Sequence, residues 1–234
     1  MPIYRLELIT AEPLFFATRE FGRVYVTDAY LHNYALTYAF GLAASSYHQP
    51  DHVPRYQEHL EPLNEQGIYL TPAKPLQVSF ASYTFKLADV RYRLQSEQLS
   101  VNIPSYGQCR EIGPESRFIS YAFTKARTTW PQWIRLGKWM SKVEVIAEEI
   151  EYEQKNGKFV SAHPLNVLDL PQQPSMFNLL NMPPVSLVTD AHLETDYYKL
   201  KGTGEEILLP AGMRYKFPEE KTTKKKVNKR NKRS

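Results

Sequence analysis

Hydrophobic and polar positions alternate from the start of the chain. Tyr4, Leu6 and Leu8 fall on one face, and Arg5 and Glu7 fall on the other. This alternation predicts a strand of about seven residues with one buried side. Alternation, or short apolar runs between turn residues, predicts further strands at 77–87, 118–124, 133–136, 141–151, 185–188, 197–200 and 206–209, with a hairpin turn at 155–158. Residues 213–217 are expected to close the folded part.

One long helix is expected near the N-terminus. Apolar residues recur at helical spacing from Leu31 to Leu42, which predicts a helix over 29–43. Thr27 and Asp28 stand where its N-cap is expected.

Strands outnumber helices and do not alternate with them, which predicts an α+β domain with an antiparallel sheet. A ferredoxin-like core with added hairpins fits the pattern best. Long loop insertions are expected at 44–75, with a short helix at 53–63, and at 88–117. The folded domain should span 1–217, followed by a disordered basic tail at 218–234.

The net charge of +4 comes from the C-terminal end. Residues 221–234 carry eight Lys or Arg and no acid, which leaves 21 basic against 25 acidic residues in 1–220. A body with that balance can bind nucleic acid only through local patches. The tail is either a solvated terminus or a non-specific phosphate contact.

Several classes of function find no support in the sequence. Cys109 is the single cysteine, so neither an internal disulfide nor a zinc site of paired cysteines can form, and a reducing cytosol is the simplest location. The chain has no apolar run of membrane-spanning length and no phosphate-binding or nucleophile motif. We therefore predict no catalytic residue, metal, cofactor or membrane contact.

Basic and aromatic residues form the first candidate site. Arg19 and Arg23 flank Phe21 just before the predicted helix, where an anion is favoured and an arginine can hold a phosphate with two donors. An ordinary salt-bridged loop is the alternative. Within the helix, His32, Asn33 and Tyr34 could reach bases by stacking or hydrogen bonding, although a single helical histidine is more often structural.

The predicted loop at 88–117 carries the richest set of candidates. Tyr106, Gln108, Arg110 and Arg117 combine aromatic, amide and guanidinium groups, which is typical of a clamp for single-stranded RNA. A surface loop balanced by nearby glutamates is the alternative.

A third group of cations follows a glycine. Gly137 permits a tight turn that could present Lys138 and Lys142. Trp133 and Trp139, on either side of this turn, are expected in the core.

Five segments, in their order and spacing, resemble a known family: 15–23, 30–36, 133–139, 163–166 and 209–215. Over about residues 1–217 the chain resembles the Csc-one subunits of type I-D CRISPR surveillance (Cascade) complexes, which belong to the Cas-five family of the RAMP superfamily.

The resemblance implies an RRM-like core with a β-hairpin thumb, at 88–117 or alternatively 44–75. It implies a non-catalytic prokaryotic subunit that caps the 5′ handle of the guide RNA (crRNA). The expected partners are the backbone subunit, the polymerase-like large subunit and target DNA near the PAM. Arginines 19, 23, 110 and 117 would hold handle phosphates, and Tyr106 or Tyr34 would stack on a handle base.

Two alternatives remain open. In some relatives from another subtype, a Tyr, Lys and His set cuts the precursor RNA. The first alternative is therefore a metal-independent endoribonuclease that uses His32 as general acid or base, with a Tyr or Lys assisting. The chain lacks a Lys-His dipeptide, which argues against this reading. The second alternative is an RNA-binding module outside any CRISPR complex.

Overall fold

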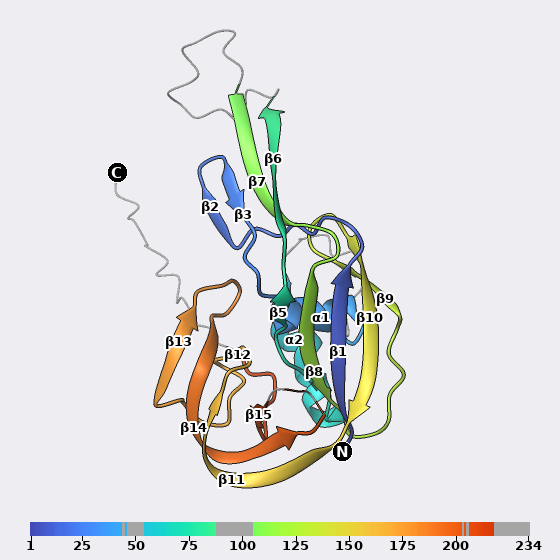
Figure 1. Cartoon of the computed structure of the whole chain (residues 1–234), viewed down its shortest axis with the longest axis vertical. Helices are drawn as coiled ribbons and strands as arrows, with labels where there is room; N and C mark the ends of the chain where they lie inside the picture. Colours follow the sequence, from blue (N-terminus) through green and yellow to red (C-terminus); the bar gives the residue numbers. More distant parts are fainter. Residues whose placement is uncertain (44, 46–53, 88–104, 203, 205, 218–234) are drawn as a thin grey trace, which may run out of the picture.

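The structure is a computed structural model that describes residues 1–43, 45, 54–87, 105–202, 204 and 206–217. In this part of the chain, three β-sheets and two helices make up the fold (Figure 1). All strand pairs but one are antiparallel in these ranges, which confirms the predicted α+β class with antiparallel sheets. The predicted tail at 218–234 lies outside the described residues.

The central sheet is built around the predicted first strand. β1 (Ile3–Thr10) pairs antiparallel with β8 (Arg117–Phe123) on one side and with β10 (Ser141–Ile150) on the other. The sheet is completed by β4 (Tyr69–Leu70), β5 (Lys74–Gln77) and β9 (Trp133–Leu136). Because β1 has antiparallel neighbours on both sides, the sheet by itself does not establish a ferredoxin-like strand order, which stays a prediction.

Alternation along β1 places apolar side chains on both faces of the central sheet. Leu6 and Leu8 pack with Leu36 of helix α1 (Asn33–Ala39). On the other face, Ile3 packs into a second core with Leu193. Helix α2 (Tyr56–Gln66) contributes Leu60 and Leu63 to this second core.

The second sheet is centred on one long strand, β14 (Leu187–Leu200). It pairs with β11 (Tyr152–Ser161), β12 (Leu165–Asn166), β13 (Met176–Leu180) and β15 (Ile207–Pro210). The predicted turn at 155–158 is wrong, because Gly157 lies inside β11 opposite Thr195 of β14. The strand predicted at 197–200 and the second half of the one predicted at 185–188 belong to this single strand.

The third sheet projects from the body (Figure 1). It consists of β2 (Arg19–Phe21), β3 (Val24–Val26), β7 (Ser105–Ile112) and β6 (Phe80–Leu87), in that order. β6 and β7 form an antiparallel hairpin, whereas β3 runs parallel to β7. Of the two proposed thumb segments, 88–117 contains β7 of this hairpin, and its part 88–104 lies outside the described residues. In 44–75, residues 44 and 46–53 lie outside them, and the rest contains α2 and β4.

The first helix is shorter than the predicted 29–43 and begins at Asn33. Its N-cap is His32, not Thr27 or Asp28, because the His32 side chain accepts the backbone N–H of Tyr34. Thr27 instead donates its hydroxyl to the carbonyl of Phe16, at 2.6 Å, and stays in the loop. Residues 213–217, the closing segment, form no helix or strand.

A buried carboxylate fixes this closing segment to the rest of the fold. Asp169 accepts the backbone N–H of Lys216 at 3.0 Å, the Asn33 amide at 2.8 Å and the Tyr69 hydroxyl at 3.0 Å. Burial raises the pKa of Asp169 to about 7, and the hydrogen bonds from these donors oppose the rise. The end of the folded chain is thereby tied to α1 and β4.

Replacing this carboxylate should destabilise the protein strongly. Asp169→Ala leaves two buried donors and one partly buried donor without their acceptor, so we expect the free energy of unfolding to fall by roughly 2–4 kcal/mol. Urea denaturation of the full chain measures the change. Asp196→Ala, which removes only an exposed bond from Asn156, is the control and should shift stability by less than about 0.5 kcal/mol. Equal effects of the two substitutions would contradict the role given to Asp169.

Candidate nucleic-acid interface

One face of the projecting sheet gathers residues from all four of its strands. Directly opposite residues in a ladder share a face. In the hairpin, Lys86 is opposite Tyr106, Thr84 opposite Gln108, and Ser82 opposite Arg110. Val24 is beside Gln108 and opposite Phe21, which extends the same face over β3 and β2. We call this set the hairpin-sheet face: Arg19, Phe21, Val24, Phe80, Ser82, Thr84, Lys86, Tyr106, Gln108 and Arg110.

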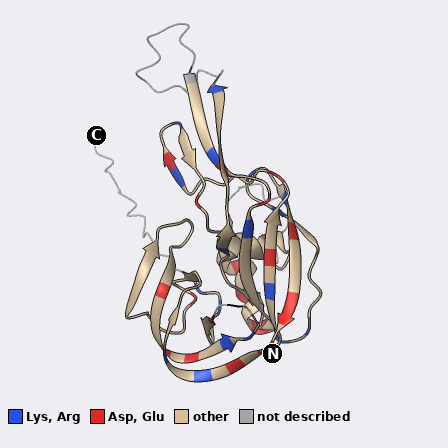
Figure 2. Cartoon of the chain, viewed as in Figure 1, with Lys and Arg blue, Asp and Glu red and all other residues tan. Residues whose placement is uncertain are grey.

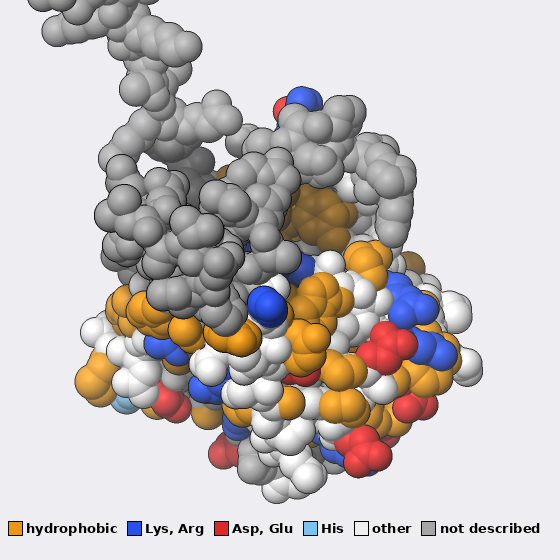
Figure 3. All heavy atoms as spheres, turned by 90° about the horizontal axis from the view of Figure 1, so that it is seen from above, with side chains coloured by type: hydrophobic (Ala, Val, Ile, Leu, Met, Phe, Trp, Pro, Cys, Tyr) orange, Lys and Arg blue, Asp and Glu red, His pale blue; other side chains and the backbone are white. Residues whose placement is uncertain are grey.

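Large aromatic side chains are exposed on the hairpin-sheet face. Phe21 is 62% exposed, Tyr106 52% and Phe80 40%. Figure 2 shows basic residues on β2, β6 and β7. β2 and β7 also carry one acid each, Glu20 and Glu111, which lie on the other face of the sheet. Viewed from above, the described surface around the projecting end shows hydrophobic side chains interspersed with Lys and Arg (Figure 3). Exposed rings beside cations are the two components of a surface that binds single-stranded nucleic acid.

The opposite face of the same sheet is occupied by ring contacts. The rings of Tyr25 and Phe85 stack with centroids 6.4 Å apart, and Phe15 meets Tyr25 edge-on at 6.5 Å. Gly107 makes room for this packing, because a Cβ there would lie 2.4 Å from Cζ of Phe85. These ring contacts occupy only part of this face, on which Tyr83 is 56% exposed.

Arg110 is held in place by a ring. Its guanidinium carbon lies 3.8 Å from the centroid of Phe80, and its Nε is buried with no hydrogen-bond partner among the described residues. A cation held over an aromatic face is preoriented while its outer N–H groups can still meet a phosphate or a base edge. In contrast, Arg19 already forms an ion pair with Asp28, at 2.6 Å.

The predicted loop carrying Arg19 and Arg23 is a small hairpin. The carbonyl of Arg23 accepts the backbone N–H of Gln108 at 2.9 Å, which joins the turn between β2 and β3 to β7. The expectation that these arginines stand at a helix N-terminus is wrong, because α1 begins later and is capped by His32. Arg19, Tyr106, Gln108 and Arg110 are nevertheless brought to one face.

Three other predicted residues lie in the core. Tyr34 is 1% exposed and donates its hydroxyl to the carbonyl of Lys216, and Asn33 donates to Asp169. The expectation that Tyr34 stacks on a base is wrong for this reason. His32 accepts the N–H of Tyr34 at Nδ1, so its Nε2 carries the proton and donates to the carbonyl of Val185 at 3.0 Å.

The remaining predicted cations lie on the body. Arg117 pairs with Glu7 at 3.1 Å, and the Lys142 ammonium lies 3.8 Å from the centroid of the Trp133 ring. Lys138 is exposed in the turn after β9, which Gly137 makes with a φ of +78°. Trp133 and Trp139 were expected in the core, but both are exposed.

Sequence reasoning did not include six members of the hairpin-sheet face among its candidate site residues: Phe21, Val24, Phe80, Ser82, Thr84 and Lys86. For the members on β6, the sequence contained a signal in the alternation along the strand predicted at 77–87. Its alternate positions Phe80, Ser82, Thr84 and Lys86 form one face beside an arginine-bearing strand.

No group of three or more His, Cys, Asp or Glu within the described ranges is placed to hold a metal ion. In the same ranges, no helix has the length and apolar character needed to cross a membrane.

Burial should keep His32 neutral over the physiological range. Desolvation lowers its pKa to about 4, against a smaller opposing effect of the bond to Val185. We expect its imidazole NMR signals to stay unchanged between pH 8 and pH 5.5. A midpoint of His32 near 6.5 would contradict the buried, capping role.

Comparison with known proteins places the chain in a family. The family described as type I-D CRISPR-associated protein Cas5/Csc1 matches residues 1–218. No curated protein matches the chain. Among solved structures, a CRISPR protein from Archaeoglobus fulgidus is similar, with 13% identity, a TM-score of 0.38, and coverage of 92% of this chain and 100% of that one. The family match spans the described fold from β1 to the closing segment, and the chain belongs to the Cas5/Csc1 family of type I-D CRISPR-associated proteins.

Proposed function

We propose that this protein is the subunit of a type I-D CRISPR surveillance complex that binds the 5′ handle of the crRNA on its hairpin-sheet face. The observation that carries the proposal is the exposure of three rings, Phe21, Phe80 and Tyr106, on one face together with Arg110 and Lys86. Bases of single-stranded RNA stack on such rings, and the cations meet the phosphates between them.

The charge of the body supports a local rather than a general mode of binding. Residues 1–220 carry more acids than bases, so attraction to phosphate must come from particular cations. Arg110 and Lys86 lie on the hairpin-sheet face and have no acidic partner among the described residues. Arg19 is at its edge and shares its charge with Asp28.

The family assignment supports the wider role. We propose an RRM-like core with the β6–β7 hairpin as thumb, contacts with the backbone and large subunits and with target DNA near the PAM, and a place in the prokaryotic cytoplasm. We also propose that the subunit is non-catalytic. Both ring nitrogens of His32 are already hydrogen-bonded, which argues against its use as a general acid or base.

Two tyrosines on opposite faces of the hairpin provide a matched test. Tyr106 is 52% exposed on the hairpin-sheet face, and Tyr83 is 56% exposed on the other face. We expect Tyr106→Ala to weaken binding of synthetic handle RNA about tenfold, the order of one lost stacked base, and Tyr83→Ala to leave it nearly unchanged. Fluorescence anisotropy with the full chain measures both affinities. Equal affinities of the two variants would remove the hairpin-sheet face as the RNA site.

The cation on the same face can be tested through salt. Arg110→Ala should reduce the slope of log affinity against log salt concentration by about one, because one phosphate contact is lost. Arg127→Ala removes an exposed arginine that pairs with Glu149 on the body, and it should leave the slope unchanged. A slope that Arg110→Ala does not alter would assign the phosphate contacts to other residues.

A further inference from the structure

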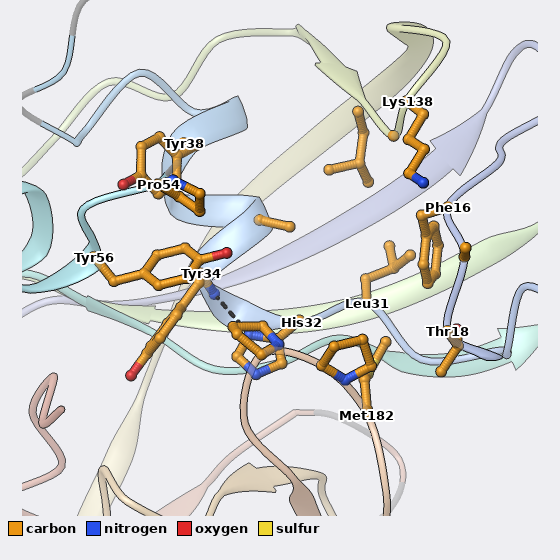
Figure 4. A pocket seen from close by; sticks show the side chains of 16 residues that line it. Phe16, Thr18, Leu31, His32, Tyr34, Tyr38, Pro54, Tyr56, Lys138 and Met182 are labelled. Atoms are coloured by element: carbon orange, nitrogen blue, oxygen red, sulfur yellow. Dashed lines mark hydrogen bonds between the residues drawn. The ribbon is translucent and has the colours of Figure 1, made fainter. Parts of the chain in front are cut away.

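A cavity of about 390 Å³ lies at the base of the projecting sheet (Figure 4). Phe16 forms one wall, Tyr56 stands on the opposite side, and Leu31 and His32 lie between them. Lys138 reaches over the cavity from the turn after β9. The volume falls in the range of about 300–1,000 Å³ that is usual for small-molecule sites.

The cavity is built by parts of the chain that are far apart in sequence. The backbone N–H of Lys138 donates to the carbonyl of Phe15 at 2.8 Å, which fixes the turn after β9 beside Phe16. Only glycine fits at position 137, immediately before Lys138, because a Cβ there would lie 2.6 Å from Cδ1 of Leu14 and 2.7 Å from the carbonyl oxygen of Phe15. The position of Lys138 is therefore set by close packing.

The walls are apolar although they contain a histidine. His32 uses one ring nitrogen to cap α1 and the other to bind Val185, so only the carbon surface of its ring remains for a ligand. The ammonium of Lys138 is exposed and has no acidic partner in the described part of the chain. A slot with aromatic walls and one unpaired cation suits a flat ring that is attached to an anion.

The cavity continues from the hairpin-sheet face. Thr18 lines it, and the next residue, Arg19, begins β2 at the edge of that face. A strand of RNA that leaves the face along β2 therefore arrives at the cavity mouth.

We propose that this cavity receives one unstacked nucleobase of the bound RNA between Phe16 and Tyr56, with an adjacent phosphate at Lys138. The inference rests on the proposed function and adds to it a separate pocket for a single base. Bases that leave the stack are commonly held between aromatic side chains in this way.

The test blocks the cavity without disturbing the core. Ala35 lines the cavity from the exposed side of α1, so Ala35→Trp fills the slot at a position that tolerates a larger side chain. Gln66→Trp, at the exposed end of α2 and outside the cavity, is the matched control. The probe is synthetic handle RNA with 2-aminopurine placed at one position at a time, and its fluorescence is read on binding to the full chain.

We expect 2-aminopurine at one position of the RNA to change its fluorescence on binding, because that base enters the cavity. That change should disappear in Ala35→Trp with about a tenfold loss of affinity, persist in Gln66→Trp, and persist in Tyr106→Ala at RNA concentrations that saturate the weaker variant. Lys138→Ala should lower the salt slope by about one, whereas Lys125→Ala, an exposed lysine outside the cavity, should not.

Two results would overturn the proposal, and they differ in what else they affect. If RNA binds and every position responds in Ala35→Trp as in the original protein, the base pocket is refuted while the hairpin-sheet face stands. If Tyr106→Ala and Tyr83→Ala bind RNA equally well, the proposed RNA face fails and the pocket fails with it. If the melting temperatures of the two tryptophan variants lie within a few degrees of each other, misfolding is not the cause of a lost fluorescence change or a lost affinity.

Discussion

Packing of aromatic rings against one side of a small sheet determines what its other side can do. Neither of the two helices found in the described residues packs on the projecting sheet. Its inner side is held by the stack of Tyr25 on Phe85 and by Phe15, which Gly107 permits by lacking a Cβ. The other side, the hairpin-sheet face, carries exposed rings and cations. The hairpin-sheet face is thus a consequence of where the sheet is anchored.

A second constraint holds the body that carries this sheet. The buried carboxylate of Asp169 ties the start of α1, strand β4 and the closing segment together. Asn64 adds a reciprocal pair of bonds to the backbone of Tyr215, both at 2.9 Å. Segments 30–36, 163–166 and 209–215 are far apart in the sequence, but each contributes to this buried polar cluster or borders it. The contacts therefore hold the three segments together. They also explain why the side chains of Asn33 and Tyr34 are unavailable for RNA.

Hydrophobic periodicity along the sequence predicted the elements whose structure is set by neighbouring residues in the chain. The alternation in β1 was enough to identify a strand with one buried face. Tyr106, Gln108 and Arg110 were predicted to lie in a loop, but they belong to strand β7 and share one of its faces. The turn at 155–158 failed because β11 pairs along its whole length with β14, a partner that the Asn-Gly signal does not reveal. The helix start failed because Thr27 and Asp28 have partners in the small hairpin, which leaves the cap to His32. A tyrosine in a helix has no local feature that separates a buried ring such as Tyr34 from a stacking one.

The most direct test of the central claim is ultraviolet cross-linking of crRNA to this subunit in the purified complex, followed by mass spectrometry of the peptides. Binding on the hairpin-sheet face predicts that handle nucleotides cross-link to peptides containing Phe21, Phe80 or Tyr106. Handle cross-links confined to the sheet formed by β11 and β14, with none on β2, β6 or β7, would contradict the account.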